Sequence, residues 1–167
     1  VAPAPLEVPW LAYERSDAVT VLSDDLRENV ASKLPAAQAD KVHVIPNFID
    51  TGRVAPGERD NAYRREFGLE GKTVVMYAGN LGFSQPVELL LDAAGAMQDE
   101  PDVAFVVNGG GSAREALVER ARGLDNVTFV CLQPKERLAE VLAAADVHVV
   151  LLRSGLARAS VPSKLYS

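Results

Sequence analysis

The chain has 167 residues, of which 48% are hydrophobic, enough for the core of one domain or of a small domain with part of another. Its 17 Lys and Arg against 23 Asp and Glu give a formal net charge of -6, which excludes a general nucleic-acid or anionic-membrane surface. The single cysteine excludes an intramolecular disulfide and a CxxC metal site, and no apolar run approaches the roughly 18 residues that span a bilayer.

The first part of the chain predicts two short strands with a helix between them. Apolar, β-branched runs at 18–22 and 42–45 are typical of strands. Ser23 stands where an N-cap belongs, and Asp24 and Asp25 follow it in the first turn, where acidic side chains favour the helix dipole. We therefore expect the helix to begin directly after Ser23.

The composition changes between residues 51 and 58, where Gly, Pro and charged residues follow one another without periodicity. Such a stretch indicates a linker or a domain boundary. We divide the chain accordingly into residues 1–57, the end of an N-terminal domain with its linker, and residues 58–167, part of a C-terminal domain. A short helix capped by Asp60 and closed by Gly68 should open this second domain.

Residues 73–152 predict a parallel sheet. Four apolar runs alternate with three helical patterns, and the runs begin at Thr73, Val103, Val127 and Val147. Their starts lie roughly 20 to 30 residues apart, which is the spacing of right-handed βαβ units. The last run, 147–152, is apolar throughout and should form a central strand buried on both faces. The predicted fold class is therefore α/β, a Rossmann-like open parallel sheet preceded by the last elements of another domain and a linker.

Two successive predicted strands end in glycine turns. Gly79 and Gly82 follow the first strand, and Gly109, Gly110 and Gly111 follow the second. A glycine after a strand often serves only a tight turn. Two such turns in succession favour a phosphate-bearing ligand, because a helix that starts past a parallel strand offers free N–H groups and the positive end of its dipole.

The second glycine turn leads into Ser112-Ala113-Arg114-Glu115, an S-x-x-E capping box that predicts a helix start. Two interpretations stay open for this turn. Either the backbone of the turn packs against a diphosphate, with the Arg114 guanidinium nearby, or the turn is only a flexible connector. The third glycine of a G-x-G-x-x-G motif is missing, and the next strand ends near Gln133 without a ribose-binding acid, which argues against a nicotinamide cofactor.

The two histidines and the cysteine are interpreted as structural residues. His43 and His148 each lie within a predicted strand and have no third metal-binding partner at a sensible spacing. Cys131 also lies in a predicted strand and should be a small buried hydrophobic residue. We expect no metal site.

Taken in order, these residues resemble the GT-B fold glycosyltransferases of the retaining, sugar-nucleotide-dependent type (group 1, family 4 type). The resemblance covers nearly all of the chain beyond residue 15 and rests on VHVIPNFID at 42–50, YAGNLG at 77–82, VVNGGG at 106–111 with Arg114, and the segments 126–133, 142–146 and 161–166. It identifies the chain as the C-terminal donor-binding region of such an enzyme. Because the chain begins at Val and ends at Ser167, we interpret it as a fragment that is inactive by itself.

The resemblance implies a nucleotide-diphosphate sugar as donor, an acceptor that is a sugar, a lipid-linked molecule or a small molecule, and neither a cofactor nor a bound metal. Arg114 and Lys164 would stabilise the leaving diphosphate, and Gln133 would lie near the base. The full set of donor-binding residues that it implies is Gly79, Asn80, Gly82, Gln85, Gly109, Gly110, Gly111, Arg114, Gln133, Ser163, Lys164 and Leu165.

The chain departs from the family pattern at two positions. Many members place Arg directly after the first glycine and Lys shortly afterwards, whereas this chain has the uncharged Asn80 and Gln85 there. We expect Lys164 to compensate. Two other functions stay open, a nucleotide-sugar epimerase of the same fold and a scaffold that has lost donor affinity. A cytoplasmic location is expected, with peripheral association at the inner face of the membrane left open.

Overall fold

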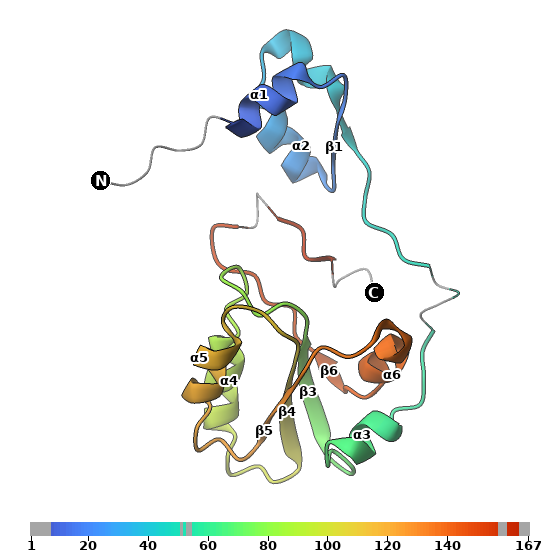
Figure 1. Cartoon of the computed structure of the whole chain (residues 1–167), viewed down its shortest axis with the longest axis vertical. Helices are drawn as coiled ribbons and strands as arrows, with labels where there is room; N and C mark the ends of the chain where they lie inside the picture. The colour runs from blue at the N-terminus through green and yellow to red at the C-terminus, as the bar shows by residue number, and fades with distance from the viewer. Residues whose placement is uncertain (1–7, 51, 53–54, 157–159, 164–167) are drawn as a thin grey trace. The chain divides into compact units, whose positions relative to one another are not determined.

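The computed structural model describes residues 8–50, 52, 55–156 and 160–163 (Figure 1). The chain forms two compact units. One contains the residues up to Phe48 together with the segment 154–166, and the other runs from Ile49 to Arg153. The domain limits that we derived from composition, 1–57 and 58–167, stay a prediction.

The first unit is a small α/β element built around two parallel strands. Its elements are α1 (Val8–Arg15), β1 (Val19–Val21), α2 (Asp24–Ala31), the 3₁₀ turn η1 (Ala36–Lys41) and β2 (Val42–Val44). Val19 pairs with Val42, and both are buried. Ser23 caps α2 as predicted, because its hydroxyl accepts a hydrogen bond from the Leu26 N–H over 3.3 Å.

The second unit is an open parallel sheet with helices on both faces, which confirms the predicted fold class. Its elements are α3 (Ala62–Glu66), β3 (Thr73–Ala78), α4 (Glu88–Ala96), β4 (Val103–Asn108), α5 (Arg114–Arg120), β5 (Val127–Val130), the 3₁₀ turn η2 (Lys135–Arg137), α6 (Leu138–Ala143) and β6 (Val147–His148). The strand order is β5-β4-β3-β6, and every pair is parallel. The order therefore reverses between β3 and β6, and ligands of such sheets bind beyond the carboxyl ends at this reversal.

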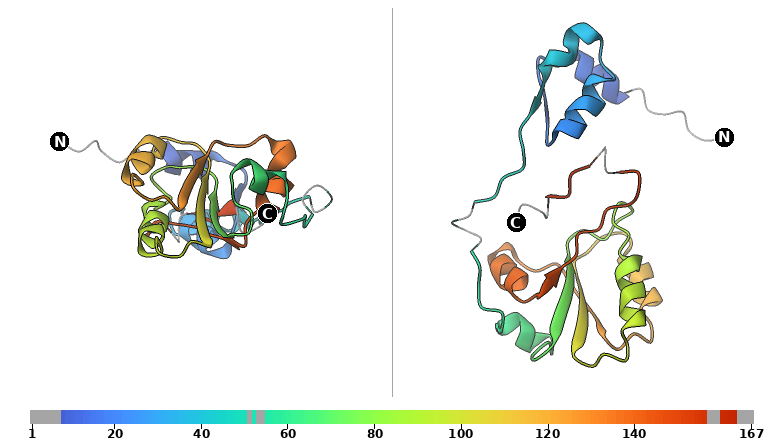
Figure 2. Two further views of the ribbon diagram at one scale, coloured as in Figure 1. Left: turned by 90° about the horizontal axis from the view of Figure 1, so that it is seen from below. Right: turned by 180° about the vertical axis from the view of Figure 1, so that it is seen from behind.

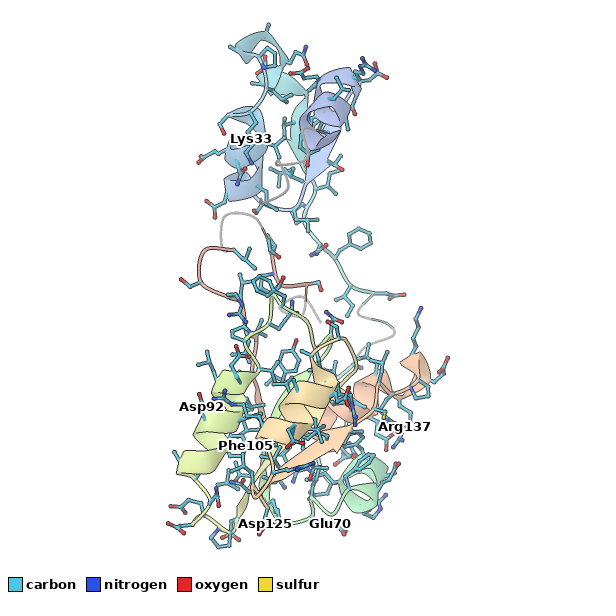
Figure 3. All side chains as sticks on the ribbon, turned by 60° about the vertical axis from the view of Figure 1, so that its left-hand side comes forward. Lys33, Glu70, Asp92, Phe105, Asp125 and Arg137 are labelled. Carbon is cyan, nitrogen blue, oxygen red and sulfur yellow. The ribbon has the colours of Figure 1, made fainter. Side chains whose placement is uncertain are left out.

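The alternation of side chains along the strands divides the core into two layers. On β3, Val74 and Met76 face one layer and Tyr77 faces the other. On β4, Val106 faces the first of these layers and Phe105 faces the second. Helices α4 and α5 lie on one side of the sheet, and α3 and α6 lie on the other, in the views of Figure 1 and Figure 2. Figure 3 shows Phe105 within the unit, in agreement with its exposed fraction of 2%.

Three strands end at the same level, which brings their following loops together. Ala78 pairs with Asn108, and Asn108 pairs with Val130 on its other side. The two glycine turns therefore leave the sheet side by side. This register is what makes one edge of the sheet available for a ligand.

The last apolar run does not form the predicted central strand. Only Val147 and His148 are in β6, and within the described part of the chain this strand pairs with β3 alone. Val147 is 48% exposed, so the expectation of burial on both faces is wrong here. The reason is the strand order, since β6 lies on the far side of β3 from β4.

Three local predictions also need correction. Asn61, rather than Asp60, caps α3 by accepting a hydrogen bond from the Arg64 N–H over 3.2 Å, although Gly68 closes the helix with the predicted positive φ of +66°. Helix α5 has no side-chain cap, so the predicted capping box does not form. Cys131 comes one residue after β5 and is exposed, not buried.

Candidate functional site

The two glycine turns pack directly against each other at the carboxyl edge of the sheet. The Leu81 N–H donates to the Gly110 carbonyl over 2.8 Å, and the Ala113 N–H donates to the Leu81 carbonyl over 3.0 Å. The Gly79 N–H donates to the carbonyl of Asn108 at the end of β4 over 2.8 Å. These cross-loop bonds make the two turns one structural unit, so the second turn is not a flexible connector.

The three glycines of the second turn have different surroundings. A Cβ on Gly109 would lie 1.9 Å from the Gly79 carbonyl oxygen, and a Cβ on Gly111 would lie 2.3 Å from the Leu81 carbonyl oxygen. Gly111 also has a φ of +146°, which other residues rarely adopt. These two glycines are therefore required by the packing of the turns. A Cβ on Gly110 would meet nothing within 4 Å, so only Gly110 has open space beside it.

The first turn has all of its backbone carbonyls engaged from Asn80 to Ser84. Their donors, in chain order, are the Tyr77 hydroxyl at 2.6 Å, the Ala113 N–H at 3.0 Å, the Gln85 N–H at 3.2 Å, the Arg153 Nε at 2.7 Å and the Arg153 N–H at 3.0 Å. Burial raises the pKa of Tyr77 to about 12, so its hydroxyl stays protonated at neutral pH and can donate.

The N–H groups of the same turn are mostly unused. Within the described part of the chain, nothing accepts a hydrogen bond from the N–H of Asn80, Gly82, Phe83 or Ser84. Successive backbone N–H groups without acceptors form anion sites in proteins. Because the carbonyls are engaged and the N–H groups are not, this turn offers donors to a ligand and few free backbone acceptors. It favours an anion even though it carries no charge.

Two buried polar side-chain atoms at these turns have no partner. In the part of the chain that the structure describes, Gln85 Oε1 and Arg114 Nε are buried without a hydrogen bond. Such atoms are rare in native structures and often mark the place of a ligand or water. The Asn80 side chain lies between the turns, since its Nδ2 would be 2.8 Å from a Cβ on Gly82 and its Oδ1 2.9 Å from a Cβ on Gly111. The Asn80 side chain thus fills the space that a side chain at position 82 would take.

Sequence reasoning missed Arg153, which follows β6 and contacts the first turn. Its Nε donates to the Phe83 carbonyl over 2.7 Å, and its Nη2 forms an ion pair with Glu88 at 3.1 Å. The guanidinium also lies over the Phe83 ring, 4.8 Å from its centroid. A single arginine at the end of an apolar run gives no local signal for such a role, because its partners lie 65 and 70 residues earlier in the chain.

Gln133 is held by its own neighbours after β5. Its Nε2 donates to the Cys131 carbonyl over 3.0 Å, and its Oε1 accepts a hydrogen bond from Arg137 Nη1 over 2.7 Å. Arg137 is itself paired with Glu66 and Glu140. The amide of Gln133 is therefore fixed in orientation, and its predicted place near a base stays a prediction.

The remaining predicted site residues fall in the C-terminal segment. Ser163 is exposed, and Lys164 and Leu165 lie outside the described residues. Their roles stay predictions. His148 bonds through Nε2 to the Leu142 carbonyl at 2.9 Å, which agrees with its interpretation as a satisfied structural residue.

The described residues offer neither a metal-binding cluster nor a membrane-spanning helix. They include no cluster of three or more His, Cys, Asp or Glu side chains that could hold a metal ion. They also include no helix that is long and apolar enough to cross a membrane.

Comparison with known proteins identifies a family. A sequence model described as "Glycosyl transferases group 1" matches residues 72–165. The chain is 35% identical over 164 residues to WcaI of Escherichia coli, named as a colanic acid biosynthesis glycosyl transferase, a match that covers 92% of this chain and 40% of WcaI. It is 30% identical over 150 residues to alpha-maltose-1-phosphate synthase of Mycolicibacterium smegmatis, covering 83% of this chain and 38% of that protein.

Solved structures show the same fold. HepE of Anabaena, crystallised in complex with UDP-glucose, superposes with a TM-score of 0.62 at 18% identity, over 83% of this chain and 39% of HepE. At this identity the likeness concerns the fold alone. The chain spans about two fifths of the length of the relatives named here, 40%, 38% and 39% respectively.

Proposed function

This chain belongs to the group 1 glycosyl transferases, and on that premise we propose that it forms the donor-binding part of an enzyme that transfers a sugar from a nucleotide-diphosphate sugar to an acceptor. We include in the proposal that transfer retains the anomeric configuration, uses no bound metal and takes place in the cytoplasm. The observation that carries it is the first glycine turn, in which the carbonyls are engaged and four N–H groups have no acceptor among the described residues.

The first turn supplies hydrogen-bond donors to the diphosphate. Phosphate oxygens accept hydrogen bonds and do not donate them at neutral pH, so a turn with free N–H groups and engaged carbonyls suits them. Negative charge builds up on the leaving diphosphate during transfer, and fixed dipoles stabilise it without reorganisation. This chemistry is suited to a turn that carries Asn80 and Gln85 in place of cations.

Positive charge would come from Arg114 and Lys164. Arg114 follows the second glycine turn, and its buried Nε has no acceptor in the part of the chain that the structure describes. A phosphate oxygen would supply that acceptor and form a charge-assisted hydrogen bond. Lys164 is the second cation in this proposal, on the strength of the sequence resemblance.

The relatives support a nucleotide sugar and a saccharide product. HepE was crystallised with UDP-glucose, and WcaI is named for colanic acid biosynthesis. We therefore propose an acceptor that is a sugar or a lipid-linked saccharide. A scaffold that does not bind donor is the second candidate, and the uncharged Asn80 and Gln85 are the observation that favours it.

The test is a titration of the full-length protein with UDP, GDP and ADP and with their sugar conjugates. Binding is monitored through the NMR chemical shifts of the backbone amides. We expect shifts at residues 80–85 and 109–114 with at least one nucleotide diphosphate. The matching nucleoside without phosphate is the control, and it should leave residues 80–85 unshifted. If none of the nucleotides moves these amides, the scaffold interpretation replaces donor binding.

A further inference from the structure

The segment after β6 holds one half of the first glycine turn through a single residue. Arg153 donates to two successive carbonyls, through Nε to Phe83 at 2.7 Å and through its backbone N–H to Ser84 at 3.0 Å. The other half of the turn is held by the second glycine turn, through Leu81. The turn is thus fixed from both sides, and Arg153 is the side that comes from the neighbouring strand β6.

These two bonds decide which backbone groups the turn leaves for a ligand. Because the Phe83 and Ser84 carbonyls accept hydrogen bonds from Arg153, both carbonyl oxygens point toward Arg153. The Ser84 N–H shares a peptide plane with the Phe83 carbonyl, so it points away from Arg153, and it has no acceptor among the described residues. Without the Arg153 side chain the Phe83 carbonyl would be free to turn, while the backbone bond to Ser84 would remain, and a carbonyl oxygen near a diphosphate would repel it.

The charge of Arg153 is already matched within the protein. Its Nη2 lies 3.1 Å from Glu88 Oε1, and its guanidinium plane lies over the ring of Phe83. The side chains of Arg153 and Glu88 are both about one third exposed, 37% and 35%. An arginine whose donors serve carbonyls, a carboxylate and an aromatic face is better placed to hold a loop than to bind phosphate itself.

We propose that Arg153 is a positioning residue for the donor diphosphate. Its side chain acts through the first glycine turn, by holding the Phe83 carbonyl away from the ligand and so keeping the Ser84 N–H, which shares that peptide plane, available. This inference rests on the proposed function. The strand order makes this arrangement possible, because β6 lies next to β3, where the order of the strands reverses.

The test compares Arg153→Ala and Arg153→Lys with Arg120→Ala in the full-length protein. Arg120 is a matched control, since it pairs with Asp92 on the surface and donates to no carbonyl in the described structure. Two quantities are measured, the hydrogen exchange of the bonded amides of Leu81, Gln85 and residue 153 without ligand, and the dissociation constants for UDP, GDP and ADP. The exchange measurement reports on the turn itself, independently of any ligand.

For Arg153→Ala we expect faster exchange at the amides of Leu81, Gln85 and residue 153, with unchanged exchange in β3 and β4. The dissociation constant of the nucleotide that binds the wild type should rise roughly ten-fold, as for loss of a hydrogen bond to a charged group. Arg153→Lys keeps the charge and one donor, so it should restore part of both effects. Arg120→Ala should change neither quantity.

Each other outcome overturns the inference in a recognisable way. Weaker binding with unchanged exchange would mean that Arg153 contacts the donor directly. Faster exchange throughout β3 and β4 would mean a general structural role, and no change in either quantity would remove Arg153 from the site. If the wild-type protein binds none of the three nucleotides, the proposed function fails first and the positioning role falls with it.

Discussion

Arg64 and Asp146 form an ion pair of 2.5 Å between Nη2 and Oδ2, across 82 residues of the chain, with the Arg64 side chain completely buried. Arg64 also donates to the carbonyls of Ala144 at 2.8 Å and Lys72 at 2.9 Å. Asp146 accepts a further hydrogen bond from the N–H of Val74 at 2.7 Å. The pair therefore ties together the segments that enter β3 and β6, at the end of the sheet opposite the glycine turns.

Replacing Asp146 with Asn should destabilise the protein. Among the described residues, the change leaves the buried Arg64 guanidinium with only the more distant Asp60 carboxylate, at 3.9 Å. Breaking a fully buried ion pair costs roughly 3 to 5 kcal/mol. We expect about 2 to 3 kcal/mol in the free energy of urea unfolding, since the Asp146 side chain is 23% exposed. Asp92→Asn, in an exposed pair with Arg120, is the control and should have little effect. Equal effects in the two variants would contradict a special role for the buried pair.

The Asp146 carboxyl should also make the protein lose stability in acid. Burial by itself raises the pKa of Asp146, but hydrogen bonds from Arg59, the Val74 N–H and Arg64 outweigh burial and hold the pKa well below its ordinary value of 3.8. A lowered pKa stabilises the folded state fully above the ordinary value, and this contribution is lost as the pH falls below it. Urea unfolding measured between about pH 6 and pH 2 should show this loss in the wild type. The loss should be smaller in Asp146→Asn, and identical pH profiles would speak against the assignment.

The glycines of the second turn should respond very differently to alanine. Gly109→Ala places a Cβ 1.9 Å from the Gly79 carbonyl oxygen, so the two turns must separate. We expect a loss of about 2 kcal/mol or more in the free energy of unfolding. Gly110→Ala meets nothing within 4 Å and should leave stability nearly unchanged. If Gly110→Ala nevertheless weakens nucleotide binding, the open space beside it is where a ligand approaches the backbone.

Arg114→Gln should separate binding from stability. Loss of a charge-assisted hydrogen bond to phosphate is worth about 1.5 to 3 kcal/mol, or a ten- to hundred-fold weaker affinity for the donor nucleotide. The free energy of unfolding should change little, because the Gln amide nitrogen can take the place of the Arg114 Nε, which has no partner among the described residues. Calorimetric titration and urea unfolding of the same variant measure both quantities. A destabilised variant with normal affinity would assign Arg114 to the fold.

Lys164→Ala tests the second cation that the sequence resemblance implies. If Lys164 contacts the diphosphate, the affinity for the donor nucleotide should fall roughly ten- to hundred-fold in the full-length protein. Lys33→Ala removes the same charge from an exposed position in the first unit and serves as the control. An unchanged dissociation constant for Lys164→Ala would remove Lys164 from the site.

The local elements were predictable, but several of their ends were not. Ser112 stands correctly for a capping box, yet the N–H of Ala113 donates to Leu81 in the other turn, and the helix begins at Arg114 without a side-chain cap. In α3 the cap moved by one residue, from Asp60 to Asn61, and both residue types can fill that position. Neither choice is visible from local preferences alone.

The sequence by itself determined the parallel α/β sheet and the two glycine turns beyond its strands. These follow from patterns within about 30 residues, namely apolar periodicity, strand spacing and glycine position. Only the tertiary structure decided that β6 lies beside β3, that Gly109 and Gly111 serve the packing of the turns, and that Arg153 holds the first turn. The physical reason is that these contacts join backbone atoms of distant segments, which the order of strands brings together and no local pattern encodes. The free N–H groups of the first turn are a consequence of those contacts.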